Sequence, residues 1–148
     1  GVRNMDDITD KMVAAYEDDD WKAVYDLYYD KYLDAMKDEF GYTEKELKDE
    51  FKDSFEDDMD DLKDDLGDIK KITVTNVDKD TYSKSDVKDA NESFKDGYDV
   101  DLKIDKMVDV RIEVEVEGED DDMDDGIIRY TAVKVGSRWY IVDHENLY

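Results

Sequence analysis

The chain has no cysteine among its 148 residues. This absence excludes a disulfide framework, a thiolate nucleophile and a cysteine-ligated zinc site. Proline is absent as well, and no internal repeat or linker-like segment interrupts the chain. A chain of this size fits one domain and buries roughly 70% of its unfolded surface. We therefore expect residues 1–148 to form a single domain with a hydrophobic core.

Basic residues are in the minority. The chain has 21 Lys and Arg against 46 Asp and Glu, which gives a formal net charge of −25 at pH 7. Nucleic acids and anionic membrane surfaces are bound by basic clusters, and the sequence contains none. We therefore expect no nucleic-acid partner. Because so large a charge also repels itself, we expect salt to stabilise the fold.

Long hydrophobic runs are missing too. No segment approaches the ~18 apolar residues that indicate a transmembrane helix. The sequence shows no signal peptide, but its first residues, GVRN, suggest a chain from which a leader was removed. Apolar residues make up only 39% of the chain and charged residues 45%. Disorder is not expected, because the apolar residues are periodic and include eleven Tyr and two Trp.

Helical periodicity marks the first half of the chain. Residues 6–18 predict a short helix, and residues 21–39 predict a second helix that Gly41 ends. The sequence TEKE at 43–46 is a capping box, and it opens the helix with the clearest apolar stripe, which Gly67 ends. We expect three N-terminal helices in this order.

The period then changes to the alternation of strands. IKKITVTNV at 69–77 is rich in β-branched residues and predicts a strand. Residues 85–97 predict one short helix that Ser85 caps. From residue 100 to residue 116 the even-numbered positions are apolar with one exception. A straight strand of that length would not fit a small domain, so we expect a bend or bulge near residues 105–107.

Two further strands complete the predicted sheet. GIIRYTAVKV at 126–135 shows a slip of its apolar parity near Ala132, which indicates a bulge. The dipeptide at 136–137 suits a two-residue hairpin turn before RWYIVD at 138–143. Charged residues at odd positions of 109–117 leave one face of the sheet in water, as is typical of antiparallel sheets. The predicted class is α+β, with three N-terminal helices and one short helix on a curved, about four-stranded antiparallel sheet.

The ending TAVKVGSRWYIVD, residues 131–143, carries a resemblance to a known family. A hairpin closed by glycine, with Trp-Tyr entering the last strand, resembles the nuclear-transport-factor-2-like (cystatin-like, α+β cone) superfamily. The order of elements is similar over nearly the whole chain. The chain looks more closely like extracellular lipoprotein-type members of this superfamily from Gram-positive gut bacteria. The resemblance implies a secreted or cell-surface bacterial protein with a signal peptide and a lipid-anchoring cysteine upstream of the domain.

Two acidic segments are candidates for cation sites. GEDDDMDDG at 118–126 does not place oxygen ligands and glycine as an EF-hand loop requires, and it joins two strands. EDDMDDLKDD at 56–65 lies opposite the apolar stripe of the third helix. We interpret the first segment as a solvated hairpin loop and the second as a solvated helix face. No metal site and no cofactor are predicted.

The single histidine and the aromatic residues are the remaining candidates for chemistry. His144 lies between two acids near the end of the chain and is expected at the surface, and no catalytic residue is assigned. Aromatic residues at helical spacing form a core in most proteins, but in a cone-shaped fold they can line a cavity. If there is a pocket, we expect it between the second helix and the concave face of the long strands. Its candidate ligand-binding residues are Trp21, Tyr28, Tyr32 and Trp139.

The main functional hypothesis is a non-enzymatic secreted or cell-surface module that binds a small ligand or a protein partner. An alternative is an enzyme similar to ketosteroid isomerases and dehydratases, with a Tyr–carboxylate site in the cone, which requires an acid that points inward. A second alternative is an acidic surface protein that binds divalent cations weakly. A monomer is expected, because the outer sheet face carries Asp109, Glu113, Glu115 and Glu117.

Overall fold

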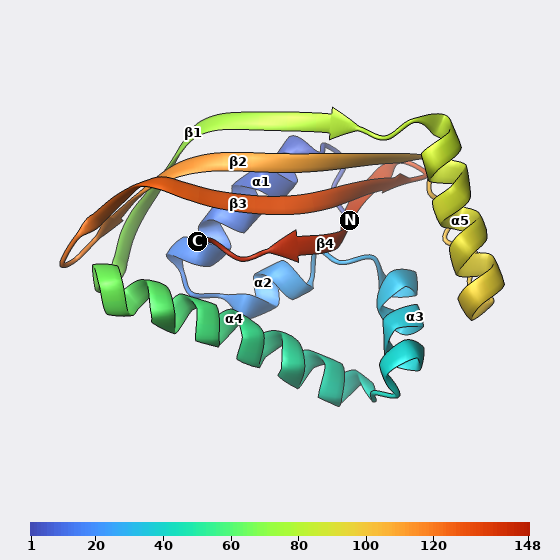
Figure 1. The fold of residues 1–148 in the computed structure, drawn as a ribbon, viewed down its shortest axis with the longest axis horizontal. Coiled ribbons are helices and arrows are strands. Elements are labelled where there is room, and N and C mark those ends of the chain that lie inside the picture. Colours follow the sequence, from blue (N-terminus) through green and yellow to red (C-terminus); the bar gives the residue numbers. More distant parts are fainter.

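The computed structural model describes residues 1–148 as five helices and a four-stranded antiparallel sheet (Figure 1). The strands follow one another in the sheet in the order β1-β2-β3-β4. The helices are α1 (Asp6–Glu17), α2 (Trp21–Tyr25), α3 (Asp30–Phe40), α4 (Glu44–Leu66) and α5 (Lys84–Tyr98). The strands are β1 (Ile69–Thr81), β2 (Lys106–Gly118), β3 (Asp122–Val135) and β4 (Arg138–Glu145). This arrangement confirms the predicted α+β class.

The sheet has one apolar face and one wet face. Along β2 every even-numbered residue from Val108 to Val116 is buried, while Asp109, Glu115 and Glu117 are exposed. The apolar face packs against α1, which lies behind the sheet in Figure 1, and against α4 along the lower edge. We call this apolar side the inner face and the wet side the outer face.

The core joins these two helices to the inner face. Tyr16 of α1 stacks on Phe55 of α4 with ring centroids 5.4 Å apart, and both side chains are fully buried. The predicted capping box opens α4: the Thr43 side chain accepts a hydrogen bond from the Glu46 backbone N–H, and the Glu46 side chain accepts one from the Thr43 backbone N–H. Gly67 follows the last residue of the helix, as predicted.

The predicted second helix is broken in two. Residues 21–39 do not form one helix, because residues 26–29 leave the helical path between α2 and α3. The Tyr29 N–H donates to the Ile141 carbonyl over 3.0 Å, and the Ile141 N–H donates to the Leu27 carbonyl over 2.9 Å. The chain therefore adds a short bridge to the free edge of β4 before it resumes as α3.

Three predicted boundaries are also wrong. The helix predicted at 85–97 is capped by Ser83 instead of Ser85 and runs through Gly97. The long strand begins only at Lys106, because the backbone N–H and C=O of Ile104 are both hydrogen-bonded to the Asn91 side chain of α5. The acidic loop at 118–126 is shorter than predicted, because β3 starts at Asp122.

The parity slip near Ala132 is confirmed, and its cause lies in the neighbouring strand. The register between β3 and β4 shifts between Thr131 and Ala132, which face Asp143 and Ile141. Val142 is thus an extra residue on β4, which is the definition of a bulge. Ile141 and Val142 are both buried in consequence.

Candidate functional site

The structure brings together only part of the predicted pocket lining. The rings of Tyr28 and Tyr32 stack with centroids 6.3 Å apart. Trp21 joins them indirectly, because Phe51 of α4 lies 6.4 Å from Trp21 and 5.6 Å from Tyr28. Trp139 is not brought to this group by any aromatic pair. Its backbone pairs instead with Val2 near the N-terminus.

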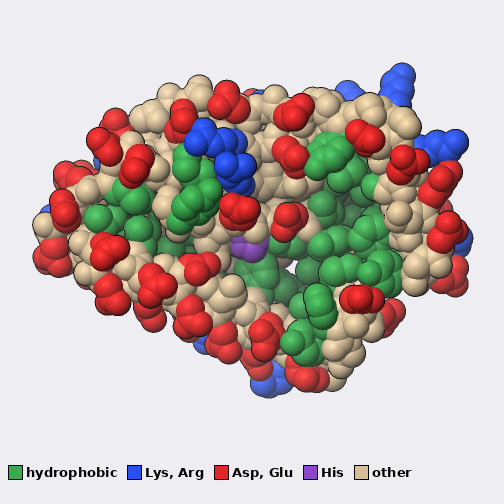
Figure 2. Space-filling view, in the orientation of Figure 1, with side chains coloured by type: hydrophobic (Ala, Val, Ile, Leu, Met, Phe, Trp, Pro, Cys, Tyr) green, Lys and Arg blue, Asp and Glu red, His purple; other side chains and the backbone are tan.

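Four half-buried aromatic residues form a continuous wall from α4 to α5. Tyr32 stacks on Phe94 of α5 with centroids 5.7 Å apart, so that the rings follow the order Phe51, Tyr28, Tyr32, Phe94. We call these four residues the aromatic wall. All four keep part of their surface exposed. Figure 2 shows a hollow with hydrophobic side chains between β4 and helices α3, α4 and α5, and the single histidine lies at its edge.

His144 is not the surface residue that the sequence predicts. The bulge at Val142 turns it to the inner face, where it lies opposite Tyr130 and is half-buried. Its ring lies 5.2 Å from the Phe51 ring and 5.6 Å from the Tyr28 ring. The sequence signal for this placement is the pair of consecutive apolar residues Ile141 and Val142 beside the slip at Ala132.

The polar atoms of His144 are part of a hydrogen-bond chain. The Tyr28 hydroxyl lies 2.5 Å from His144 Nδ1, and His144 Nε2 lies 3.0 Å from Asn146 Oδ1. Asn146 Oδ1 also accepts from the buried Tyr16 hydroxyl, and Asn146 Nδ2 donates to Asp58 of α4. Since Asn146 Oδ1 can only accept, Nε2 carries the proton and a neutral His144 accepts from Tyr28 through Nδ1.

Burial shifts the pKa values of His144 and Tyr28, which belong to this hydrogen-bond chain, in opposite directions. Desolvation lowers the pKa of His144, while the hydrogen bond to Asn146 and the charges of Asp143 and Asp58 act in the opposite direction. Desolvation raises the pKa of Tyr28 well above its ordinary value, and Asp143 adds to the shift. The neutral forms of both groups are therefore favoured at neutral pH. In these neutral forms His144 accepts the hydrogen bond of the Tyr28 hydroxyl, and the Tyr28 oxygen can still accept one from a ligand.

Asp58 is the only acid that takes part in this hydrogen-bond chain, and it does so at the end of the chain. Asp58 is exposed and reaches the chain only through Asn146, so the polar partner of Tyr28 is a histidine and not a carboxylate. No group of three or more Asp, Glu or His side chains is arranged to hold a metal ion. The acids of the segment 118–126 lie in the short turn and along the start of β3.

The main surface depressions lie elsewhere. Five of them have volumes between about 300 and 600 Å³, and none includes Trp21, Tyr28, Tyr32 or Trp139 in its lining. His144 lines two of these depressions, one across the sheet and one beside α4.

None of the five helices combines the length and apolar character needed to cross a bilayer. No protein-family model, curated protein or solved structure matches the chain.

Proposed function

We propose that this chain is a non-enzymatic binding module of the nuclear-transport-factor-2-like type, secreted or held at the cell surface. Its ligand is the apolar part of a small molecule or of a protein partner. The hollow beside the aromatic wall is the binding surface. The observation that carries the proposal is the wall itself, four linked rings that none of the surrounding elements covers completely.

Physical reasons support this choice of surface. Binding sites are concave and mostly apolar, with a few polar groups that orient the ligand. The hollow offers hydrophobic side chains, and the histidine at its edge is hydrogen-bonded to Tyr28. The Tyr28 hydroxyl donates to His144, and its oxygen keeps lone pairs that can accept from a ligand hydroxyl. The rest of the surface is strongly acidic, so an apolar hollow offers the main gain from desolvation.

Titration of the ¹⁵N- and ¹³C-labelled protein with p-cresol tests this proposal. This small phenol can stack on the wall and donate a hydrogen bond to the Tyr28 oxygen. We expect saturable shifts of the ring signals of Tyr32 and Phe94, with smaller shifts elsewhere. Tyr32→Ala removes the middle of the wall and should weaken binding about tenfold, the effect of losing an aromatic contact of 1.5 kcal/mol.

Tyr148→Ala is the matched control, since Tyr148 is exposed and does not belong to the wall. It should leave the p-cresol affinity unchanged. Shifts that do not saturate, or an equal loss of affinity in both variants, would show that the hollow is not a binding surface.

One observation favours an enzyme as the second candidate. The Tyr28–His144 contact resembles the hydrogen-bonded pairs of acid–base catalysis. Desolvation lowers the pKa of His144, which favours its neutral form at neutral pH. In a lyase or isomerase the Tyr28 oxygen would take the substrate proton while Tyr28 passes its own proton to His144 Nδ1. His144→Gln would abolish such turnover, whereas ligand binding by a non-enzymatic module would survive this substitution.

A further inference from the structure

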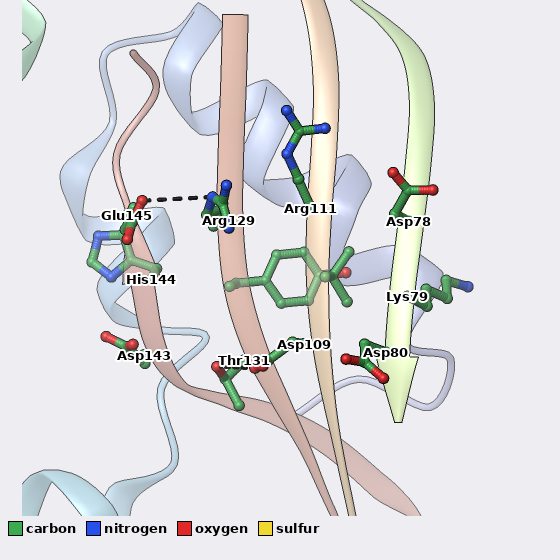
Figure 3. Close-up of a pocket in the computed structure, with 12 residues that line it drawn as sticks. Asp78, Lys79, Asp80, Asp109, Arg111, Arg129, Thr131, Asp143, His144 and Glu145 are labelled. Atoms are coloured by element: carbon green, nitrogen blue, oxygen red, sulfur yellow. Dashed lines mark hydrogen bonds and ion pairs between the residues drawn. The ribbon is translucent and has the colours of Figure 1, made fainter. Parts of the chain in front are cut away.

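The outer face of the sheet carries a depression that the proposed function does not use. It has a volume of about 420 Å³ and takes three consecutive residues from each of the four strands (Figure 3). Side chains that point to the outer face form two rows across the strands. The first row is Asp78, Arg111, Arg129 and Glu145, and the second row is Asp80, Asp109, Thr131 and Asp143.

Each row places like charges directly opposite each other in the register. Arg111 faces Arg129 across β2 and β3, and Asp80 faces Asp109 across β1 and β2. Like charges in directly opposed positions destabilise a sheet. The outer acids of the first row reduce this cost, because Asp78 faces Arg111 and Glu145 faces Arg129. Arg111 and Arg129 nevertheless lie on the side of the depression opposite Asp109, with the Arg111 guanidinium group turned along its strand toward Glu113.

These groups keep hydrogen-bonding capacity for a ligand. Arg111 donates to Glu113 over 2.8 Å, and Arg129 lies 3.8 Å from Glu145, so that most of the five N–H donors of each arginine stay free. Both arginine side chains are more than a third exposed. The Asp109 carboxylate accepts from the Tyr82 and Thr131 hydroxyl groups, which hold it in place, and each oxygen keeps a further lone pair.

We propose that this depression binds a free α-amino acid. The ligand carboxylate lies between Arg111 and Arg129, and the ligand ammonium group lies at Asp109. The two rows are about 7 Å apart, because two residues of a strand advance the chain by that distance. That spacing suits a ligand that carries both charges on one carbon atom, with one hydrogen bond at each end. The ligand carboxylate offsets the repulsion between the two arginines.

The charge pattern favours a zwitterion over a ligand with one charge. Five carboxylates and two arginines point to the outer face at the depression, because the nearby Lys79 pairs with Asp6 of α1, and the whole chain carries a net charge of −25. A plain anion is therefore repelled by the surroundings, and a plain cation meets the two arginines. A zwitterion satisfies both ends without adding net charge. A peptide end offers only one of the two groups, so a free amino acid is the source that fits.

Glycine is the probe, because it is a net-neutral zwitterion and leaves the ionic strength unchanged. In an NMR titration at low ionic strength we expect saturable shifts of the signals of Asp109, Arg129 and Thr131. N-acetylglycine lacks the ammonium group and glycinamide lacks the carboxylate. Each should bind at least about tenfold more weakly, which corresponds to the loss of one charge-assisted hydrogen bond.

Arg129→Gln should weaken glycine binding about tenfold for the same reason. Arg138→Gln is the matched control, since Arg138 is an exposed arginine of β4 outside the depression, and it should bind glycine as the wild type does. The proposal is overturned if glycine gives no saturable shifts, if the two blocked derivatives bind as well as glycine, or if Arg129→Gln keeps the wild-type affinity.

Discussion

At the scale of single residues, His144 is the group whose environment departs furthest from its sequence context. It lies between two acids in the sequence, yet the bulge turns it inward against Tyr28 and Phe51. Since desolvation lowers its pKa below the ordinary 6.5, the folded state binds this proton less readily than the unfolded state. The stability that His144 contributes is therefore fully present above about pH 6.5, and it is lost as the pH falls through the lowered pKa.

We expect His144→Gln to remove this dependence. Glutamine keeps a polar side chain near Tyr28 and Asn146 but does not titrate. Urea unfolding should be measured for both proteins at steps from about pH 7.5 to pH 5. The difference in the free energy of unfolding between wild type and variant should shrink as the pH falls, because only the wild type must bury a neutral histidine. A constant difference across the range would mean that the pKa of His144 is not lowered.

Phe55 shows what a single core residue contributes. It is 1% exposed and stacks on Tyr16 between α1 and α4. Phe55→Ala should destabilise the fold by about 3–5 kcal/mol, because it leaves a cavity where these helices meet. Phe40→Ala is the matched control: Phe40 is 60% exposed, and its replacement should change stability by no more than about 0.5 kcal/mol. Urea unfolding at neutral pH compares the two variants, and similar losses would place Phe55 outside the core.

At the scale of elements, the N-cap of α5 in the structure differs from the N-cap that the sequence predicts. The pattern predicts Ser85 as the N-cap, whereas the Ser83 side chain accepts from the Asp86 backbone N–H over 3.1 Å. Ser83→Ala should therefore cost about 1 kcal/mol of stability, and Ser85→Ala should cost much less. Both substitutions introduce the same side chain two residues apart, so each is the control of the other. The free energy of unfolding of both variants should be measured with urea. A larger loss in Ser85→Ala than in Ser83→Ala would mean that Ser85 is the N-cap, as the sequence predicts.

The elements that could be predicted from the sequence are those with local causes. The capping box at Thr43, the stop at Gly67 and the alternation of β2 arise from neighbouring residues, and the structure confirms them. The break at residues 26–29 arises from hydrogen bonds to Ile141, more than a hundred residues away. Periodicity alone does not reveal such a contact. Residues 100–105 depart from the strand pattern for the same reason, because Asn91 of α5 binds the backbone of Ile104.

The candidate site follows the same rule. Tyr28 and Tyr32 were recognisable because their spacing places them on one side of a helical stretch, and they do lie together. The partners Phe51, Phe94 and His144 come from three other elements, and their approach depends on how α4, α5 and β4 pack. The inward turn of His144 depends on one extra residue in β4. A shift of one residue in a strand exchanges its two faces, so the position of a bulge decides which side chains reach a site.

At the scale of the whole molecule, charge is the dominant feature. Acids cover much of the face in Figure 2, and most of the ion pairs join exposed side chains, which contribute little stability each. The exposed acids of the outer sheet face, among them Asp109, Glu115 and Glu117, would face each other in a sheet-to-sheet dimer. We therefore propose a monomer at low ionic strength, which sedimentation equilibrium can check.

The stability of the fold should rise with salt. With a net charge of −25, the folded chain holds its acids closer together than the unfolded chain does, so screening favours the folded state. Raising the ionic strength from 0.01 to 0.1 M shortens the Debye length from about 30 to about 10 Å. We expect the melting temperature to increase by about 2–4 °C for each kcal/mol of repulsion that is screened.

Calorimetry should compare NaCl with CaCl₂ at equal ionic strength. Equal increases would be the result of screening, whereas a larger increase with calcium would favour the cation-binding alternative. A melting temperature that does not change with either salt would show that self-repulsion does not limit this fold.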